Sequence, residues 1–169
     1  MKHFLPFLLV LAAFEGQAQQ VIRYSATTGD LSLSAASTAT LQQPATNGTD
    51  VVIDQIVVYC SVACNVTQAA NGAAATTTVG TVTPLLPAPL NSPVTVKFFT
   101  TSNVGTGTAQ GGITHIPAGG TVVLCLSRSC GASGDVVVGY GAGAASNYSA
   151  TIASINGTAN ITFFLRSSQ

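Results

Sequence analysis

The residues best able to do chemistry in this chain of 169 residues are its four cysteines, which form two close pairs. Three residues separate Cys60 from Cys64, and four separate Cys125 from Cys130. Zinc ligands can have similar spacing, but an even number of cysteines behind a secretion signal is typical of disulfides. We therefore expect two disulfides and no free thiol.

The pairing of these cysteines depends on the local backbone. In one continuous strand, residues 60 and 64 would lie about 13 Å apart, which is too far for a disulfide. If residues 61–63 form a turn instead, Cys60 and Cys64 face each other and can bond. We favour the local pairs Cys60–Cys64 and Cys125–Cys130 over the alternative, in which the two segments are joined to each other.

Groups that could catalyse a reaction are scarce. After residue 18 the chain has one histidine, His115, and no glutamate, tryptophan or methionine. A Ser–His–Asp triad would lack the Gly-x-Ser-x-Gly turn that exposes a serine nucleophile. Asp50 and Asp54 could form a carboxylate pair of the glycosidase type, but solvation or turn capping explains them better. We expect no enzyme activity, no catalytic residue, no cofactor and no metal site.

Five Asn-x-Ser/Thr sequons are candidates for N-glycosylation: Asn47, Asn65, Asn147, Asn156 and Asn160. The alternative explanation is a threonine-rich composition in an organism that does not use sequons. A surface rich in serine and threonine could also carry O-linked sugar. Glycans are therefore candidate partners of this chain.

The first 18 residues have the pattern of a secretory signal. Lys2 and His3 give a positive start, residues 4–14 form an apolar core, and Gly16-Gln17-Ala18 is a small-residue cleavage site. The apolar core is too short for a membrane span, which needs about 20 residues. We expect a secreted protein, extracellular or on the cell surface, without a membrane span.

The remaining chain alternates short Val- and Thr-rich runs with turns about every ten residues, without helical periodicity. This spacing predicts an all-β fold, an antiparallel β-sandwich that is jelly-roll-like, with eight or nine short strands. Residues 54–67 are interpreted as a buried hairpin that turns at residues 61–63. Asn156-Gly157 predicts a second hairpin near the end of the chain.

We divide the chain into a signal peptide (1–18), an N-terminal extended arm or first strands (19–43) and a β-sandwich domain (44–169). The arm shows strand alternation on both sides of a Thr-Gly-Asp turn, and turn residues separate it from the domain. One interpretation is an ordinary first strand. The other is a donor strand that completes the sheet of a neighbouring copy, with Leu31 and Leu33 filling a groove.

The stretch Ile113 to Leu126, ITHIPAGGTVVLCL, resembles part of the small β-sandwich domains of virion decoration and tail-fibre proteins. Together with the preceding hairpin-like segment, the resemblance covers about half of the chain. It implies a structural, surface-displayed β-domain, and it carries over no functional residue. A signal peptide departs from what a virion protein assembled in a cytoplasm would have.

Composition and strand pattern both favour association. Charged residues make up 6% of the chain, against about 25% in ordinary globular proteins, and the net charge is zero. No basic patch exists that would attract nucleic acid. Several predicted strands are apolar on both faces, which would leave apolar surface on an isolated sandwich: Val51–Ile53, Val57–Tyr59, Val122–Leu126, Val136–Val138 and Phe163–Leu165.

These features predict a structural subunit of an extracellular filament or surface assembly, a homopolymer whose partners are copies of itself. The contacts would be apolar faces of the sandwich and, in addition, the exchanged N-terminal strand. The alternative is a secreted carbohydrate-binding or adhesive module. Such modules usually display exposed aromatic residues or calcium-binding carboxylates, and this chain has no tryptophan and no acidic cluster.

Overall fold

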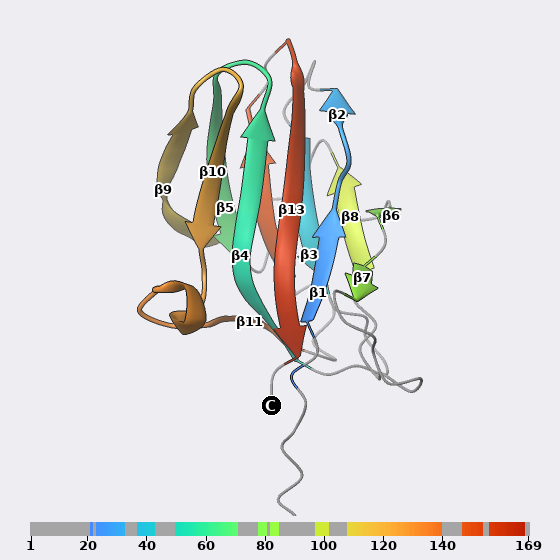
Figure 1. The fold of residues 1–169 in the computed structure, drawn as a ribbon, viewed down its shortest axis with the longest axis vertical. Coiled ribbons are helices and arrows are strands. Elements are labelled where there is room, and N and C mark those ends of the chain that lie inside the picture. Colours follow the sequence, from blue (N-terminus) through green and yellow to red (C-terminus); the bar gives the residue numbers. More distant parts are fainter. Residues whose placement is uncertain are drawn as a thin grey trace, which may run out of the picture.

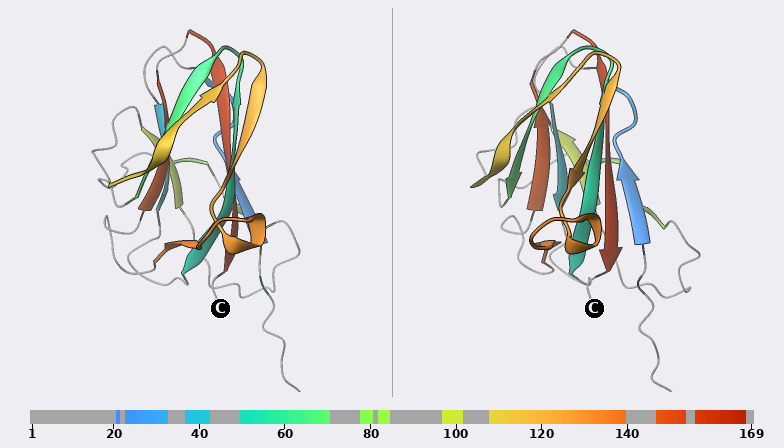
Figure 2. Two further views of the ribbon diagram at one scale, coloured as in Figure 1. Left: turned by 90° about the vertical axis from the view of Figure 1, so that its left-hand side faces the viewer. Right: turned by 60° about the vertical axis from the view of Figure 1, so that its left-hand side comes forward.

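The computed structural model describes residues 21, 23–32, 37–42, 50–70, 78–80, 82–84, 97–101, 108–139, 147–153 and 156–167. These residues form two antiparallel sheets that lie face to face (Figures 1 and 2). The strands are β1 (Arg23–Thr27), β2 (Leu31–Ser32), β3 (Ser37–Gln42), β4 (Val51–Cys60), β5 (Cys64–Ala70), β6 (Thr78–Gly80), β7 (Val82–Pro84), β8 (Lys97–Thr101), β9 (Thr108–Ile116), β10 (Gly120–Cys125), β11 (Val136–Val138), β12 (Asn147–Ile152) and β13 (Thr158–Ser167).

One sheet, which we call sheet A, has the strand order β10-β4-β13-β1-β7, with β11 beside β4 and β2 beside β13. The other, sheet B, has the order β6-β8-β3-β12-β5-β9. Four of the thirteen strands (β2, β6, β7 and β11) have only two or three residues, which leaves nine longer strands. The all-β antiparallel sandwich is therefore confirmed. The helical content of the described residues is one 3-10 turn, η1 (Arg128–Cys130).

The core lies between the sheets and is built by period-two alternation along the long strands. In β13 the side chains of Ile161, Phe163 and Leu165 point inward and are at most 1% exposed. From sheet B, Tyr148 and Ile152 of β12 join the same cluster. The Tyr148 hydroxyl donates a hydrogen bond to Oε1 of Gln68 at 2.9 Å, and burial raises the pKa of Tyr148 to about 12. Apolar burial of this kind is the main force holding the sheets together.

The N-terminal segment contributes strands to both sheets of its own chain. β1 lies between β13 and β7 in sheet A, and β3 lies between β12 and β8 in sheet B. Leu31 begins the short strand β2 and packs against the core, half-buried. Leu33 and the predicted signal peptide (1–18) lie outside the described residues. No helix in the described part of the chain is long and apolar enough to cross a membrane.

The two predicted hairpins are wrong in one respect, because their strands do not pair with each other. β4 belongs to sheet A and β5 to sheet B, and β12 and β13 are divided in the same way. The turn at Pro117 to Gly119 also leads from sheet B (β9) to sheet A (β10). Each connection is therefore an arch, a turn whose two strands lie in opposite sheets. The arches meet at one end of the sandwich, the top in Figure 1.

The arches are hydrogen-bonded to one another around Ser61. Its backbone N–H donates to the carbonyl of Thr158 at 2.8 Å, and its hydroxyl accepts from the Thr158 N–H at 2.8 Å. The N–H of Gly119 donates to the Ser61 carbonyl at 3.2 Å. Three connections that are distant in sequence thus satisfy one another's backbone groups by hydrogen bonds.

Candidate functional site

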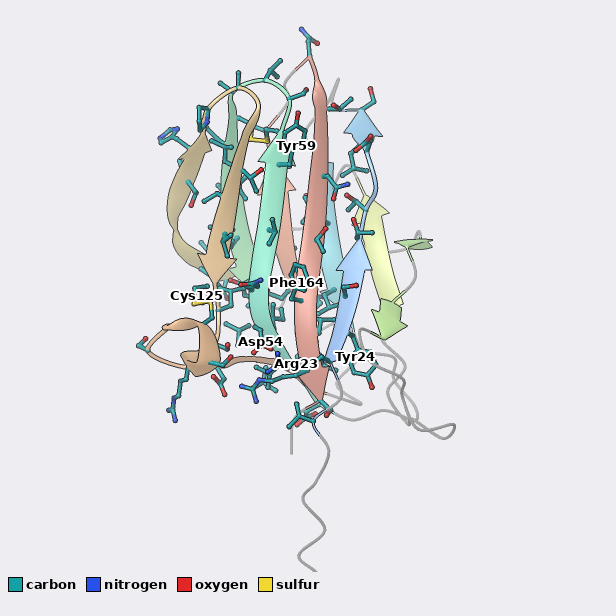
Figure 3. The ribbon with its side chains drawn as sticks, viewed as in Figure 1. Arg23, Tyr24, Asp54, Tyr59, Cys125 and Phe164 are labelled. Carbon is teal, nitrogen blue, oxygen red and sulfur yellow. A yellow bond between two sulfur atoms is a disulfide. The ribbon has the colours of Figure 1, made fainter. Side chains whose placement is uncertain are left out.

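The outer face of sheet A carries the side chains that alternate with those of the core, and the strand register arranges them in rows. From the arch end downward the rows are Thr121, Tyr59 and Asn160; Val123, Val57 and Thr162; Cys125, Gln55 and Phe164; and Val137, Val52 and Arg166. Figure 3 looks onto this face, with Tyr59 toward the arches and Arg23 and Asp54 toward the opposite end. Apolar and uncharged residues fill its upper part, and the charges lie below.

Three apolar side chains on this face are open to solvent. Tyr59 is 38% exposed, Val123 of β10 is 54% exposed and Val137 of β11 is 50% exposed. Val57, between Tyr59 and Val123, is half-buried. By contrast Val52 is only 3% exposed. On sheet A the exposed apolar surface therefore lies on β4, β10 and β11, along one edge, whereas on sheet B Ile113 of β9 is 61% exposed.

The lower part of the face is organised by Asp54, at a bulge in β4. The register between β4 and β13 shifts there, so that Asp54 has no partner residue on β13. Its Oδ1 atom accepts three hydrogen bonds of 2.9 Å, from Nε of Arg166 and from the hydroxyls of Ser127 and Ser129. Ser127 is completely buried. The bulge directs the Asp54 carboxylate toward three donors. Two of them, Ser127 and Ser129, lie in the loop after β10, so their hydrogen bonds hold this loop against β4.

Asp135 completes this cluster from the other side of the same loop. It accepts a hydrogen bond from the backbone N–H of Arg128 at 2.8 Å and one from the Arg166 guanidinium at 3.0 Å. These two donors lower the pKa of Asp135, the Arg128 N–H having the larger effect. The hydrogen bond to Asp54 chiefly raises the pKa of Arg166. We call Asp54, Ser127, Ser129, Asp135 and Arg166 the Asp54 cluster.

Both predicted local disulfides are present, and all four cysteines are paired. The Cα atoms of Cys60 and Cys64 are 6.3 Å apart because residues 61–63 turn, as the favoured pairing required. Cys125–Cys130 closes the loop that carries η1, next to the Asp54 cluster. Such bonds are typical of proteins that mature in an oxidising compartment.

A cavity of about 430 Å³ opens beside the Asp54 cluster. Its lining consists of Arg23, Asp54, Gln55, Ser129, Cys130, Phe164 and Leu165. Arg23 takes part in neither of the ion pairs among the described residues, both of which belong to Arg166. The cavity thus combines the Arg23 guanidinium, which has no counter-ion among the described residues, with a carboxylate, an amide, a hydroxyl and an aromatic ring, so that most of its lining groups are polar.

A second cavity, of about 610 Å³, lies at the arch end on the side of sheet B. Ala63, Cys64, Asn65, His115, Ile116, Pro117 and Ala153 line it. Its polar side chains are His115 and Asn65, register partners on β9 and β5, and Nδ1 of His115 is hydrogen-bonded to Oδ1 of Asn65. His115 is thus placed beside a sequon asparagine, and the described lining of this cavity contains no aspartate.

The sequons differ in how accessible the structure makes them. Asn65 and Asn156 are exposed, whereas Asn147 is 2% exposed. Asn160 is half-buried, and its Oδ1 atom accepts hydrogen bonds from the hydroxyls of Thr27 and Thr162. Asn47 lies outside the described residues. Of the aspartates singled out by sequence, Asp50 is exposed and Asp54 belongs to the cluster described above.

The sequence did not predict the Asp54 cluster or the position of Arg23 beside the cavity. Their members come from five segments of the chain, β1, β4, the loop after β10, the residue before β11, and β13. The only signal in the sequence was the small number of charged residues, which makes each of them a candidate for an ion pair. Within the described residues, no three His, Cys, Asp or Glu side chains gather where they could hold a metal ion.

Comparisons with protein-family models, with curated proteins and with solved structures give no match to this chain. The chemistry of its surface is therefore the basis for assigning a role.

Proposed function

We propose that this protein is a structural subunit that is secreted and associates with copies of itself, through the edge of sheet A formed by β10. The observation that carries the proposal is the unpaired edge of this strand. Among the described residues β10 pairs with β4 alone, so its other edge has unpaired backbone N–H and C=O groups. Exposed edges of this kind are templates for pairing with another chain.

β10 lacks the devices that usually prevent such pairing. Natural edge strands are protected by charged side chains, proline, bulges or a covering element. The sequence of β10, GTVVLC, contains no charge and no proline, and its register with β4 runs without a bulge. Val123 at its centre is 54% exposed, beside Val57 and Tyr59. An antiparallel β10–β10 contact between two copies would extend sheet A and place side chains of the neighbouring β10 beside Val123.

This contact would be isologous, since the same surface serves both copies, and by itself it closes a dimer. Growth to a filament or layer requires a second contact. Exchange of the 19–43 segment between copies would supply one, because β1 and β3 would make the same pairs with a neighbour that they make within one chain. The low charge of the whole chain supports association at either contact.

The test of the β10 contact is the oligomeric state of Val123→Lys, measured by size exclusion with light scattering and by electron microscopy. A lysine at this position adds charge to the edge and to the apolar face, so we expect the β10 contact to be lost and assembly to be reduced. Ser32→Lys is the matched control, because Ser32 is exposed on β2, away from β10. Assembly of Val123→Lys to the same extent as the unmodified protein would contradict the proposal.

Strand exchange is tested separately by a cysteine pair at Thr27 and Thr162. Their hydroxyls lie 3.1 Å apart on neighbouring strands, so two cysteines there can be joined. Exchange predicts covalent multimers on non-reducing gels, whereas strands kept within one chain give only monomers. N-terminal sequencing of exported protein tests secretion, and we expect the mature chain to begin at Gln19.

A further inference from the structure

Two arginines face each other across neighbouring strands on the outer face of sheet A. Arg23 of β1 and Arg166 of β13 are register partners. Like charges directly opposite each other on one face of a sheet are destabilising unless they are compensated. Arg166 is compensated by Asp54 at 2.9 Å and by Asp135 at 3.0 Å. Arg23 has no such partner among the described residues, is exposed, and lines the 430 Å³ cavity.

Besides Arg23, the same cavity contains side chains that can accept or donate hydrogen bonds. The three donors that reach Asp54 contact Oδ1, which leaves Oδ2 as an acceptor within the described part of the chain. Gln55 contributes an amide that can donate and accept, and Ser129 contributes a hydroxyl oxygen. Phe164, in the same row as Gln55 and half-buried, adds an aromatic ring to the lining. Figure 3 shows Phe164, Asp54 and Arg23 on this one face.

We propose that this cavity binds a saccharide that carries a carboxylate, such as a uronic or sialic acid. Arg23 would bind the carboxylate, since a guanidinium matches its two oxygens with parallel N–H donors. Asp54, Gln55 and Ser129 would exchange hydrogen bonds with sugar hydroxyls. The ring of Phe164 would pack against the apolar face of the pyranose. The cavity volume lies within the range of about 300–1,000 Å³ typical of ligand sites.

The balance of charge selects this class of ligand over a phosphorylated one. Arg166 and its two aspartates together carry one negative charge, next to the single positive charge of Arg23. A phosphate dianion would therefore be repelled by the Asp54 cluster while it bound Arg23. A ligand with one carboxylate and several neutral hydroxyls places its charge at Arg23 and offers hydroxyl donors to Asp54.

The site is independent of the proposed assembly contact. None of Val57, Tyr59, Val123 and Val137 lines the cavity, and none of the cavity residues belongs to β10. Loss of assembly in Val123→Lys and loss of sugar binding in an Arg23 variant are therefore separate outcomes, and either can fail without the other. The Val123→Lys protein is itself suitable for titration if the unmodified protein forms large particles.

The test is calorimetric titration with trigalacturonic acid, a hyaluronan tetrasaccharide and sialyllactose. Fully methyl-esterified trigalacturonate is the matched ligand, because it keeps the hydroxyls and loses the charge. We expect at least one acidic sugar to bind at millimolar concentration or below. Arg23→Gln and methyl esterification should each weaken that binding about tenfold or more, the effect of losing one charge-assisted contact.

Arg128→Gln is the control variant, since Arg128 is exposed on η1 and is absent from the cavity lining. Its affinity should stay within about twofold, because distant surface charges contribute little. Phe164→Leu should weaken binding of the acidic sugar while leaving the fold intact, as judged by circular dichroism. No binding of any of the three sugars at millimolar concentration would overturn the proposal. Equal weakening by Arg128→Gln and Arg23→Gln, or equal binding of the methyl ester, would also overturn it.

Discussion

Gly157 lies directly against Val62, although the two residues belong to different arches. A β carbon at Gly157 would stand 2.7 Å from Cγ2 of Val62 and 2.8 Å from Oγ of Ser61. Ser61 is also the residue whose backbone and hydroxyl bind Thr158. The arch end is therefore closely packed around one glycine, and its stability should depend on the absence of a side chain there.

We expect Gly157→Ala to lower the free energy of unfolding by about 1–3 kcal/mol, the usual cost of overpacking. The added methyl group would have to displace Val62 and disturb the hydrogen bonds of Ser61. Gly134→Ala is the control, since nothing lies within 4 Å of a β carbon there. Chemical denaturation of both variants is the measurement. Equal stability of the two would show that the arches are not packed as described.

Asp54→Asn should destabilise the protein by about 1–3 kcal/mol, because hydrogen bonds to a charged group are worth more than neutral ones. The substitution weakens the acceptor of three donors and leaves Arg166 with only Asp135 as a counter-ion. Asp30→Asn, at an exposed turn, should change stability by less than about 0.5 kcal/mol. Urea denaturation of the two variants compares them. A loss with Asp30→Asn as large as that with Asp54→Asn would contradict the role of the cluster.

The loop between β10 and β11 should loosen in acid. The pKa of Asp135 is lower in the folded protein than its usual value, because the Arg128 N–H and Arg166 favour the carboxylate. A carboxyl group of this kind stabilises the fold above the unfolded pKa of about 3.9, and the contribution is lost as pH falls through the lower, folded pKa. The protection of the amides of residues 126–135, which is their exchange rate compared with the intrinsic rate at the same pH, should therefore decrease below about pH 4. In Asp135→Asn this acid dependence should be reduced, and an unchanged profile would assign it to another group.

Glycosylation should follow the exposure of the sequons. If the protein is produced in a host that glycosylates, folded secreted material should carry sugar at Asn65 and Asn156, which are exposed. Asn147 is 2% exposed, so a glycan there could not fit the folded structure. Peptide mapping by mass spectrometry measures the occupancy of each site. A glycan on Asn147 in folded protein would contradict the placement of β12, and Asn147→Gln serves as the control for assignment.

Much of the fold could be predicted because strands and turns are encoded locally. The β-branched and aromatic residues of the run from Ile161 to Leu165, which follows the Asn156-Gly157 turn signal, predict β13 without any knowledge of its neighbours. The pairing of Cys60 with Cys64 followed from their spacing and from a turn between them. Low charge and apolar outward residues likewise predicted exposed apolar surface, which is observed at Val123 and Val137.

The sequence by itself determined where the chain extends and where it turns, and it favoured the local disulfides, since each of these depends on a few adjacent residues. Only the tertiary structure decided that β4 and β5 lie in opposite sheets, because a turn reverses the chain equally well in a hairpin and in an arch. It also decided that Asp54, Asp135 and Arg166 meet, and that Arg23 lies beside a cavity with no counter-ion among the described residues. Asp54 and Arg166, for example, are 112 positions apart in the sequence. These relationships depend on which strands become neighbours, and that is set by burial of the whole core rather than by any local pattern.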